Sequence, residues 1–492
     1  NLGIDIDRYY TLVFGFGAAL AAIGGIILGG AQNVNPGMGS GVIIPAFVIV
    51  VLGGLGSFRG AVFGGLLVGI VQVLMRTYSG TVLADVGGVS LFVPNLEGMT
   101  IFLLMIVVLL LKPQGLFGNP EWQTGSEEEG ELLVGGQGGV FARSTRVKLG
   151  AVVVGLLAVT PFLSLLTGNE FYITLLSEIL VWTIFALSLD IVMGYAGLVP
   201  LGHTMFYGVG AYASALVMLH FTSSFVVALF GAILVCAVIA WVVGTLSIRV
   251  SGVYFAMITL AFAELFYNAV FKFDFTGGSD GLLGFDALLG VFGAGVPLSE
   301  FELQIAGFEL GSQIMFYYLV LLFGLLSFLL ARRIMNAPFG SVLQSIRESE
   351  ERTEFIGYDV ITYKRRAFVI SGGMAGLAGG LWAINPSTFV ISPDQTLHWI
   401  NSGEVIVMTL LGGMGTLFGP MLGAGVFIGI EDVLAQYTEQ WRLIVGVVFV
   451  LFVLFVPRGL VSVPSLLNSH FRDPDEDEPS LGVEEPEVKS ND

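Results

Sequence analysis

Long apolar runs alternate with short polar segments along most of the chain. A helix needs about 20 mostly apolar residues to cross a bilayer. Two of the apolar runs are interrupted by glycine-rich breaks, at Gly53–Ser57 and Gly412–Thr416. Irregular backbone at membrane depth is tolerated only where protein or a cavity covers it. The pattern therefore predicts an all-α, polytopic helical membrane protein with about 12–14 membrane segments, including broken or re-entrant ones.

Polar segments divide the chain into two membrane units. Residues 119–148 are rich in glycine and glutamate, which is typical of a flexible linker on the cytosolic side. Residues 464–492 are acidic and contain several prolines, which is typical of a disordered tail. We therefore expect one membrane unit at residues 1–118 and a second at residues 149–463.

The first unit repeats the end of the second. Three blocks match in the same order: Gly3–Ile6 with Gly357–Val360, Leu52–Ser57 with Leu411–Thr416, and Lys112–Leu116 with Val456–Leu460. Matched blocks in one order indicate two related units fused in parallel orientation. The first unit corresponds only to the last third of the second, so we expect its front part, with a further polar segment, to lie upstream of Asn1 or on another subunit.

One strongly charged segment, Ala331–Arg366, lies between apolar runs and holds seven of the twenty basic residues. Pro338 marks a helix start, and Gly357 is placed to end a helix. Val342 and Ile346 fall on one helical face, which is apolar. The pattern predicts one short amphipathic helix that ends at the glycine. A solvated loop is the alternative.

Basic residues also predict which side each segment occupies, because short cytoplasmic loops hold an excess of lysine and arginine. Arg143, Arg146 and Lys148 place the linker inside the cell. Six spans later the chain returns inside at the charged segment, and the broken run before the end places the tail there too. The loop Lys272–Gln313 is then expected outside, and the plasma membrane is the expected location.

Composition supports a membrane protein and excludes several other classes. The 492 residues are 55% hydrophobic and only 12% charged, whereas a soluble domain carries about 25% charged residues. The net charge of −18 makes nucleic acid an unsuitable partner. The single cysteine, Cys236, excludes a disulfide framework, and no Cys/His cluster has the spacing of a metal site.

The chain also lacks the sequence signals of an enzyme. A phosphate-binding P-loop needs a glycine-lysine pair, and none of the five lysines follows a glycine. No nucleophile–base triad or paired-carboxylate site is recognisable. We therefore expect no catalytic residue, no bound cofactor and no ATP hydrolysis by this chain itself.

The charged segment resembles the coupling motif of ATP-binding-cassette importer permeases, in which Glu-Ala-Ala is followed after three residues by Gly. Here Glu351, Arg352 and Thr353 precede Gly357, so two other residues replace the alanines. Motifs across roughly residues 149–462 resemble LivM-type branched-chain amino-acid permeases, and residues 1–118 resemble the end of the LivH type. The motifs that carry the resemblance are Gly194–Gly197, Leu201–His203, Gly210–Tyr212, Gly252–Ala256, Thr276–Gly281, Ala367–Ser371 and Ala375–Gly379.

This resemblance implies a permease subunit of an importer for branched-chain or other hydrophobic amino acids. Separate ATPase subunits, with ATP and Mg²⁺, would dock on the coupling helix, and an extracytoplasmic binding protein would deliver the solute at Lys272–Gln313. A further permease subunit is another expected partner. The candidate coupling residues are Gly340, Ile346, Arg347, Glu348, Glu351 and Gly357.

Several residues are candidates for the translocation pathway: Gly197, His203, Thr259, Glu264, Gly412, Gly413, Gly53 and Gly54. An ionisable residue inside a span, such as Glu264, is a functional hypothesis by default, with a packing hydrogen bond as the alternative. His203 is more often a structural histidine than a gate. The glycine breaks are explained either by tight helix crossing or by unwound backbone that meets the solute.

Other polar residues in the apolar runs have simpler explanations. Asp190, near the end of its run, is expected at the membrane interface, and Glu404 or Glu431 could face an aqueous cavity. Leu198 and Pro200 stand where the related permeases carry Gln and Ser, which removes two polar groups.

Three functional alternatives stay open from the sequence. The same importer class could carry urea, a short amide or a sugar-like solute. An ion-coupled secondary transporter or channel could use Glu264 as its coupling site. A non-functional remnant is the third alternative, because the first unit lacks a coupling segment of its own.

Overall fold

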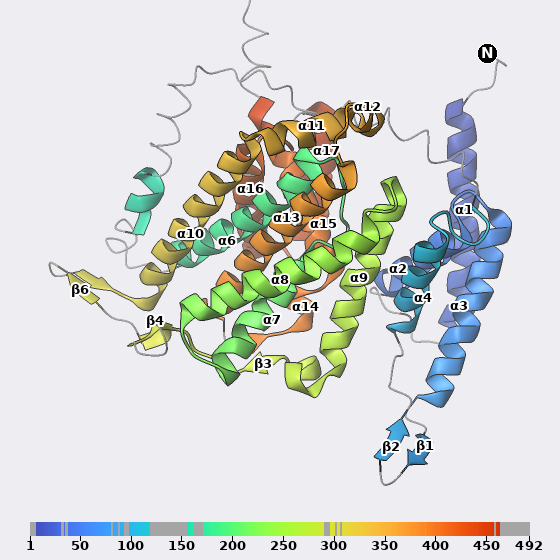
Figure 1. The fold of residues 1–492 in the computed structure, drawn as a ribbon, viewed down its shortest axis with the longest axis horizontal. Helices are drawn as coiled ribbons and strands as arrows, with labels where there is room; N and C mark the ends of the chain where they lie inside the picture. The colour runs from blue at the N-terminus through green and yellow to red at the C-terminus, as the bar shows by residue number, and fades with distance from the viewer. Residues whose placement is uncertain are drawn as a thin grey trace, which may run out of the picture.

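The computed structural model is a bundle of long helices with a few short strands at its periphery (Figure 1). The structure describes residues 6–30, 34, 38–79, 82–86, 89–92, 98–118, 155–161, 171–289, 296–300, 303–305, 308–388, 390–456 and 459–462. The expected linker, 119–148, and tail, 464–492, lie outside these residues. Seven of the described helices are long and apolar enough to cross a membrane. The prediction of an all-α, multi-pass membrane protein is confirmed.

In its described residues, the first unit contains four helices and one small hairpin. The helices are α1 (Ile6–Gly29), α2 (Met38–Gly53), α3 (Phe58–Tyr78) and α4 (Thr100–Leu111), and strands β1 (Val82–Val86) and β2 (Val89–Phe92) pair antiparallel. Helices α2 and α3 pack together, and both contact α4. The most apolar part of α1, in contrast, contains no buried residue.

The second unit forms the larger bundle. Its helices are α6 (Phe171–Asp190), the π-helical turn η3 (Ile191–Tyr195), α7 (Thr204–His220), α8 (Phe225–Ser247), α9 (Gly252–Lys272), α10 (Ser312–Met335), α11 (Pro338–Glu348), α12 (Glu350–Phe355), α13 (Val360–Ala383), α14 (Pro393–Thr396), α15 (Trp399–Gly412), α16 (Phe418–Tyr437) and α17 (Trp441–Phe455). Short antiparallel ladders pair β3 (Leu282–Leu283) with β8 (Val390–Ile391), β4 (Leu288–Leu289) with β5 (Val296–Pro297), and β6 (Leu303–Ile305) with β7 (Phe308–Leu310). Single turns of 3₁₀ helix lie at Asp274–Thr276, Gly278–Asp280, Leu298–Glu300 and Leu460–Ser462.

Helix α13 is the central helix of this unit and packs against α6, α7 and α8. Glycines on α13 permit the close approach. A Cβ on Gly379 would meet the carbonyl of Tyr207 on α7, and a Cβ on Gly376 would meet Cys236 on α8. In lipid, where apolar burial does not drive helices together, such small residues allow the backbone contact that holds a bundle. The glycine-rich sequence of α13 thus explains its central position.

The two units meet along α4 and α9, which pack directly on each other. Near one end of this contact the hydroxyl of Tyr254 donates to the carbonyl of Gln114, at 3.4 Å. Near the other end, Gly98 lies against the side chain of Asn268. Helix α9 therefore contacts the first unit along most of the length of the helix.

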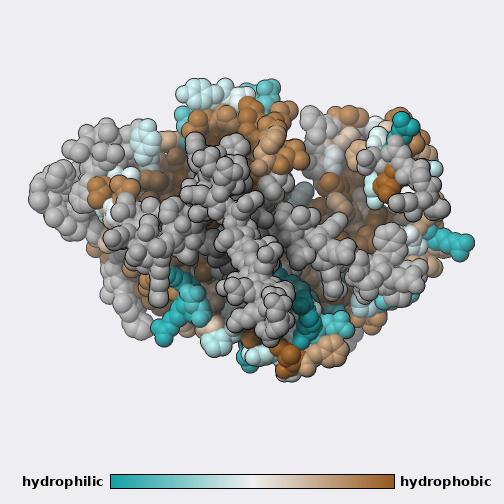
Figure 2. All heavy atoms as spheres, turned by 90° about the horizontal axis from the view of Figure 1, so that it is seen from above, coloured by the Kyte–Doolittle hydropathy of each residue, from teal (hydrophilic) through white to brown (hydrophobic). Residues whose placement is uncertain are grey.

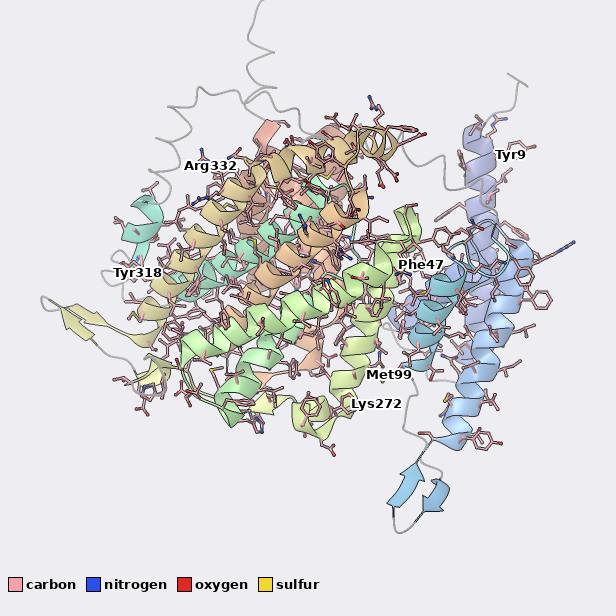
Figure 3. All side chains as sticks on the ribbon, viewed as in Figure 1. Tyr9, Phe47, Met99, Lys272, Tyr318 and Arg332 are labelled. Atoms are coloured by element: carbon pink, nitrogen blue, oxygen red, sulfur yellow. The ribbon has the colours of Figure 1, made fainter. Side chains whose placement is uncertain are left out.

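The charged segment lies at one end of the bundle. Arg332 marks this end in Figure 3, and Lys272, at the close of α9, lies at the opposite end. Tyr9, near the start of α1, is on the Arg332 side, as is the start of α13 (Figures 1 and 3). Equivalent helices of the two units thus run in the same direction. Figure 2 views the end that carries α11 and α12, where hydrophilic side chains lie beside hydrophobic ones.

The packing of α13 generates a testable contrast between two glycines. Gly379→Ala should destabilise the bundle, because overpacking a close contact costs about 1–3 kcal/mol and the Tyr207 carbonyl cannot move freely. Gly429→Ala, where nothing lies within 4 Å, should be neutral or stabilising by about 0.5–1 kcal/mol. Thermal unfolding of both variants in detergent measures the difference. Equal melting temperatures would contradict the packing role of Gly379.

Candidate functional site

Helix α11 presents an apolar face to the bundle. Pro338 occupies its first turn, where its missing N–H costs nothing. Val342, Leu343 and Ile346 are buried against the ends of the membrane helices. Gly340 is buried as well, and a Cβ there would meet the backbone of Met335. The predicted apolar face is confirmed, and Gly340 is the position at which α11 lies closest to the end of α10.

The prediction of a single helix up to Gly357 is wrong, because the helix breaks at Ser349. Ser349 has extended backbone, and its hydroxyl accepts a hydrogen bond from the N–H of Arg352, which starts α12. Serine at this position satisfies an amide that the new helix would otherwise leave free. The chain then ends α12 at Phe355, and Gly357 adopts φ 94°, as expected of a glycine after a helix.

One ion pair joins α12 to α13, and a separate hydrogen bond caps the start of α13. The buried ammonium group of Lys364 pairs with the carboxylate of Glu350 at the start of α12. The carboxylate of Asp359 accepts from the N–H of Thr362, at 3.1 Å, and caps α13. Hydrogen bonds from Thr362 hold the pKa of Asp359 below its usual value. The ion pair therefore fixes the start of α12 to the N-terminal part of the central helix.

The outward side of the segment is exposed and mixed in character. Phe355 is 82% and Ile356 71% exposed, next to the exposed charged residues Glu351 and Arg352. Large apolar side chains among charges at a surface are typical of a protein–protein interface. The segment thus has an inner face fixed to the bundle and an outer face that is available.

Asp190 makes a buried polar contact in this region, and its expected position at the membrane interface stays a prediction. The residue is fully buried at the end of α6. One carboxylate oxygen accepts from the N–H of Gly415, at 2.6 Å, and the other from the N–H of Leu417, at 3.0 Å. Both amides belong to the turn between α15 and α16. Asp190 was missed as a site residue because nothing in the local pattern indicates which distant amides it meets.

The turn that Asp190 binds has unusual backbone. Among the described residues, Leu417 is the one non-glycine with positive φ, at 59°. Left-handed backbone costs such a residue about 1–2 kcal/mol. Hydrogen bonds to a charged group contribute about 1.5–3 kcal/mol each, so the two bonds to Asp190 can offset this cost.

Arg347 connects α11 to the same place. Its guanidinium donates to the carbonyl of Gly194 in the π-helical turn. A Cβ on Gly197 would lie 3.1 Å from the Arg347 Cγ, and one on Gly415 would lie 3.1 Å from its Nη1. Burial lowers the pKa of Arg347, while the carboxylates of Asp190 and Glu348 oppose that shift. Arginine stays charged under these conditions, so a cation lies at this junction.

The expected pathway residues fall into three groups in the structure. Gly197 contacts Arg347 of the charged segment. Gly412 and Gly53 lie in helix hairpins, where a Cβ would meet the carbonyls of Gly419 and Gly60. This geometry is the close-crossing explanation of the breaks. Gly413 and Gly54 beside them adopt positive φ, which favours glycine at both positions. A pathway role for these glycines stays a prediction.

His203, Thr259 and Glu264 form the third group, at the contact of α7 with α9. The His203 ring stacks on Phe185 with centroids 5.4 Å apart, and its Nε2 lies 2.9 Å from the hydroxyl of Ser188. No described residue pairs with its Nδ1. The preceding residue, Gly202, packs on the Thr259 carbonyl.

Glu264 continues this polar line along α9 and is only 7% exposed. Within one turn of it, the Tyr267 hydroxyl donates to Asp394 at 2.6 Å, and the Tyr267 ring contacts His398 edge-on. The N–H of Thr204, at the start of α7, donates to Ser402 on α15, at 2.8 Å. Sequence reasoning missed Tyr267, Asp394 and Ser402, because their partners are more than a hundred residues away.

A family model described as branched-chain amino acid transport system, permease component, matches residues 1–109 and 171–454. The chain belongs to this family. The two matched ranges leave out residues 119–148 and 464–492, and they include both glycine-rich breaks and the charged segment.

Individual relatives divide between the two units of the permease. Over 303 residues this chain is 28% identical to LivM of Salmonella typhimurium. The match covers 57% of this chain and 68% of LivM. A probable LivM of Methanocaldococcus jannaschii is 25% identical over 315 residues, covering 56% of this chain and 86% of the relative. LivH of Escherichia coli is 43% identical over 121 residues, which are 24% of this chain and 35% of LivH. No solved structure matches the permease.

The helix break at Ser349 in the charged segment leads to a local prediction. Ser349→Ala should remove the cap of α12 and cost about 1 kcal/mol, which raises amide exchange in residues 350–355 about fivefold. Ser341→Ala, on the exposed side of α11, is the matched control. Hydrogen exchange of the permease in nanodiscs measures both, and unchanged exchange in Ser349→Ala would contradict the capping role.

Proposed function

We propose that this chain is the membrane permease of an ATP-driven importer for branched-chain or other hydrophobic amino acids. The observation that carries the proposal is a charged segment whose inner face is buried in a LivM-like bundle and whose outer face exposes Phe355 and Ile356. A transporter driven only by an ion gradient has no need of such a surface. LivM and LivH are named for high-affinity branched-chain amino acid transport.

The partners follow from this assignment. ATPase subunits would dock on α11 and α12, and ATP with Mg²⁺ would bind to those subunits, with no cofactor and no catalytic residue on this chain. The coupling segment, linker and tail would face the cytoplasm across the plasma membrane. A solute-binding protein would deliver the amino acid to the opposite end, at Lys272–Gln313, and a further permease subunit would complete the assembly.

The solute pathway in this proposal follows the polar side of α9. Helix α9 carries Thr259 and Glu264, lies against His203 through Gly202, and faces the first unit along α4. An interface between two permease units is where a membrane pathway forms when the units move apart. Glu264, an ionisable residue at membrane depth, would meet the ammonium group of an amino acid.

Charge reversal on the outer face tests the docking surface. Glu351→Arg should weaken ATPase docking by about tenfold, equivalent to about 1.4 kcal/mol, because Glu351 is exposed and away from the bundle contacts. Uptake of radiolabelled leucine into proteoliposomes with the ATPase subunits and binding protein should fall in proportion. Glu300→Arg, an exposed charge reversal in the loop expected outside, should leave ATPase docking unchanged.

The driving force separates this function from its alternatives. Uptake should require ATP inside the vesicles and should survive collapse of proton and sodium gradients. Uptake that follows an ion gradient without ATP would favour the secondary transporter. Uptake of urea or a short amide in place of leucine would keep the mechanism and change the solute.

A further inference from the structure

We propose that Asp190 and Arg347 form a junction that transmits movement of the coupling segment to the α15–α16 hairpin. The role in transport rests on the proposed function. The connection itself rests on the geometry around the two residues. It makes Asp190, a residue with no motif around it, a positioning residue for transport.

The first step is the connection of Asp190 to the hairpin. Its two oxygens each accept one N–H, from Gly415 and Leu417, so the carboxylate spans the turn. The turn contains the left-handed residue Leu417 between left-handed Gly415 and the start of α16. Strained backbone of this kind persists only where its surroundings hold it, and it is frequent at elements that switch.

The second step is a comparison within the molecule. The hairpin of α2 and α3 has the same sequence pattern, and Ser57 caps α3 as Thr416 caps α16. Phe58 occupies the position that corresponds to Leu417. No described side chain accepts from the N–H of Phe58, and its φ is not positive. The left-handed residue therefore occurs in the hairpin that binds a carboxylate and not in its repeat.

The third step is the connection to α11. Arg347 donates to Gly194, which lies in the π-helical turn directly after Asp190. Its side chain also passes Gly197 and Gly415, both with positive φ. One side chain of the coupling segment thus touches the turn after α6, the following corner and the hairpin turn. π-helical turns and left-handed glycines can change conformation without disturbing the helices beside them.

These contacts define a route for movement. A displacement of α11 moves Arg347, and Arg347 pulls on the carbonyl of Gly194 through their hydrogen bond. Because Asp190 lies at the other end of the same π-helical turn, its carboxylate is reoriented. Asp190 in turn releases or retightens the amides of Gly415 and Leu417, so that α15 and α16 can change their relative angle. A simple structural role for Asp190 would hold the hairpin but would not make its position depend on α11.

Distance measurements in the reconstituted importer distinguish the two roles. Spin labels at Ser341→Cys and Trp241→Cys report movement of α11 against α8, and labels at Tyr437→Cys and Trp241→Cys report movement of α16. All three positions are exposed, whereas the native Cys236 is fully buried. In the wild-type background, trapping with an ATP analogue should change both distances.

In Asp190→Asn, the α11 distance should still change, the α16 change should be lost, and leucine uptake per ATP should fall by about tenfold or more. Arg347→Gln should behave alike without altering the buried carboxylate, and the double variant should be no worse than either single one. Asp432→Asn, at the far end of α16, and Arg333→Gln, at the end of α10, are the matched controls. Wild-type uptake per ATP together with both distance changes in Asp190→Asn would overturn the junction.

A second measurement keeps the junction separable from the proposed function. In the isolated chain in nanodiscs, Arg347→Gln should speed amide exchange at Gly415 and Leu417, whereas Arg333→Gln should not. Wild-type protein that transports without ATP would overturn the importer assignment, and faster exchange would still support the junction. Unchanged exchange at both amides would overturn the junction whatever drives transport.

Discussion

A helix that stops inside a membrane protein must find partners for the amides and carbonyls it leaves unpaired, because lipid offers none. Both glycine-rich breaks meet this demand with protein groups. In the first unit, the N–H groups of Leu116 and Phe117 bond the carbonyls of Leu52 and Gly53. In the second unit, Gly459 packs on Gly413 and the Asp190 carboxylate binds the amides of the turn. The end of α6 and the segment at Gly459 together cover the second break.

Local pattern was sufficient to predict the features that arise within a few residues of each other. The apolar runs, the buried face of α11 and the helix-ending Gly357 follow from periodicity and from backbone preference. Ser349 was a missed signal, since serine followed by acidic residues is typical of a helix start. The burial of Asp190 could not be predicted, because its partners lie more than two hundred residues along the chain.

The two units use the same sequence pattern in unequal surroundings. Helix α13 is enclosed by three helices, whereas its counterpart α1 has its most apolar part fully exposed. The blocks Lys112–Leu116 and Val456–Leu460 have the same structural role in the two units. Each brings the chain back into contact with a glycine-rich break. Within the described residues, the repeat therefore covers α1 and α13, the helix hairpin with its glycine-rich break, and the segment that closes on that break.

The common direction of α1 and α13 has a consequence for how such proteins can be joined genetically. The last described segment of the first unit packs through Gly118 on Gly54, and its Gln114 meets Tyr254 near the start of α9. This end of α9 is opposite Lys272 and is therefore on the side of Tyr9, near the start of α1 (Figure 3). Two subunits whose ends lie on one side of a membrane can be translated as a single polypeptide without adding a span. The parallel arrangement thus allows two related helix units to share one polypeptide without an added span.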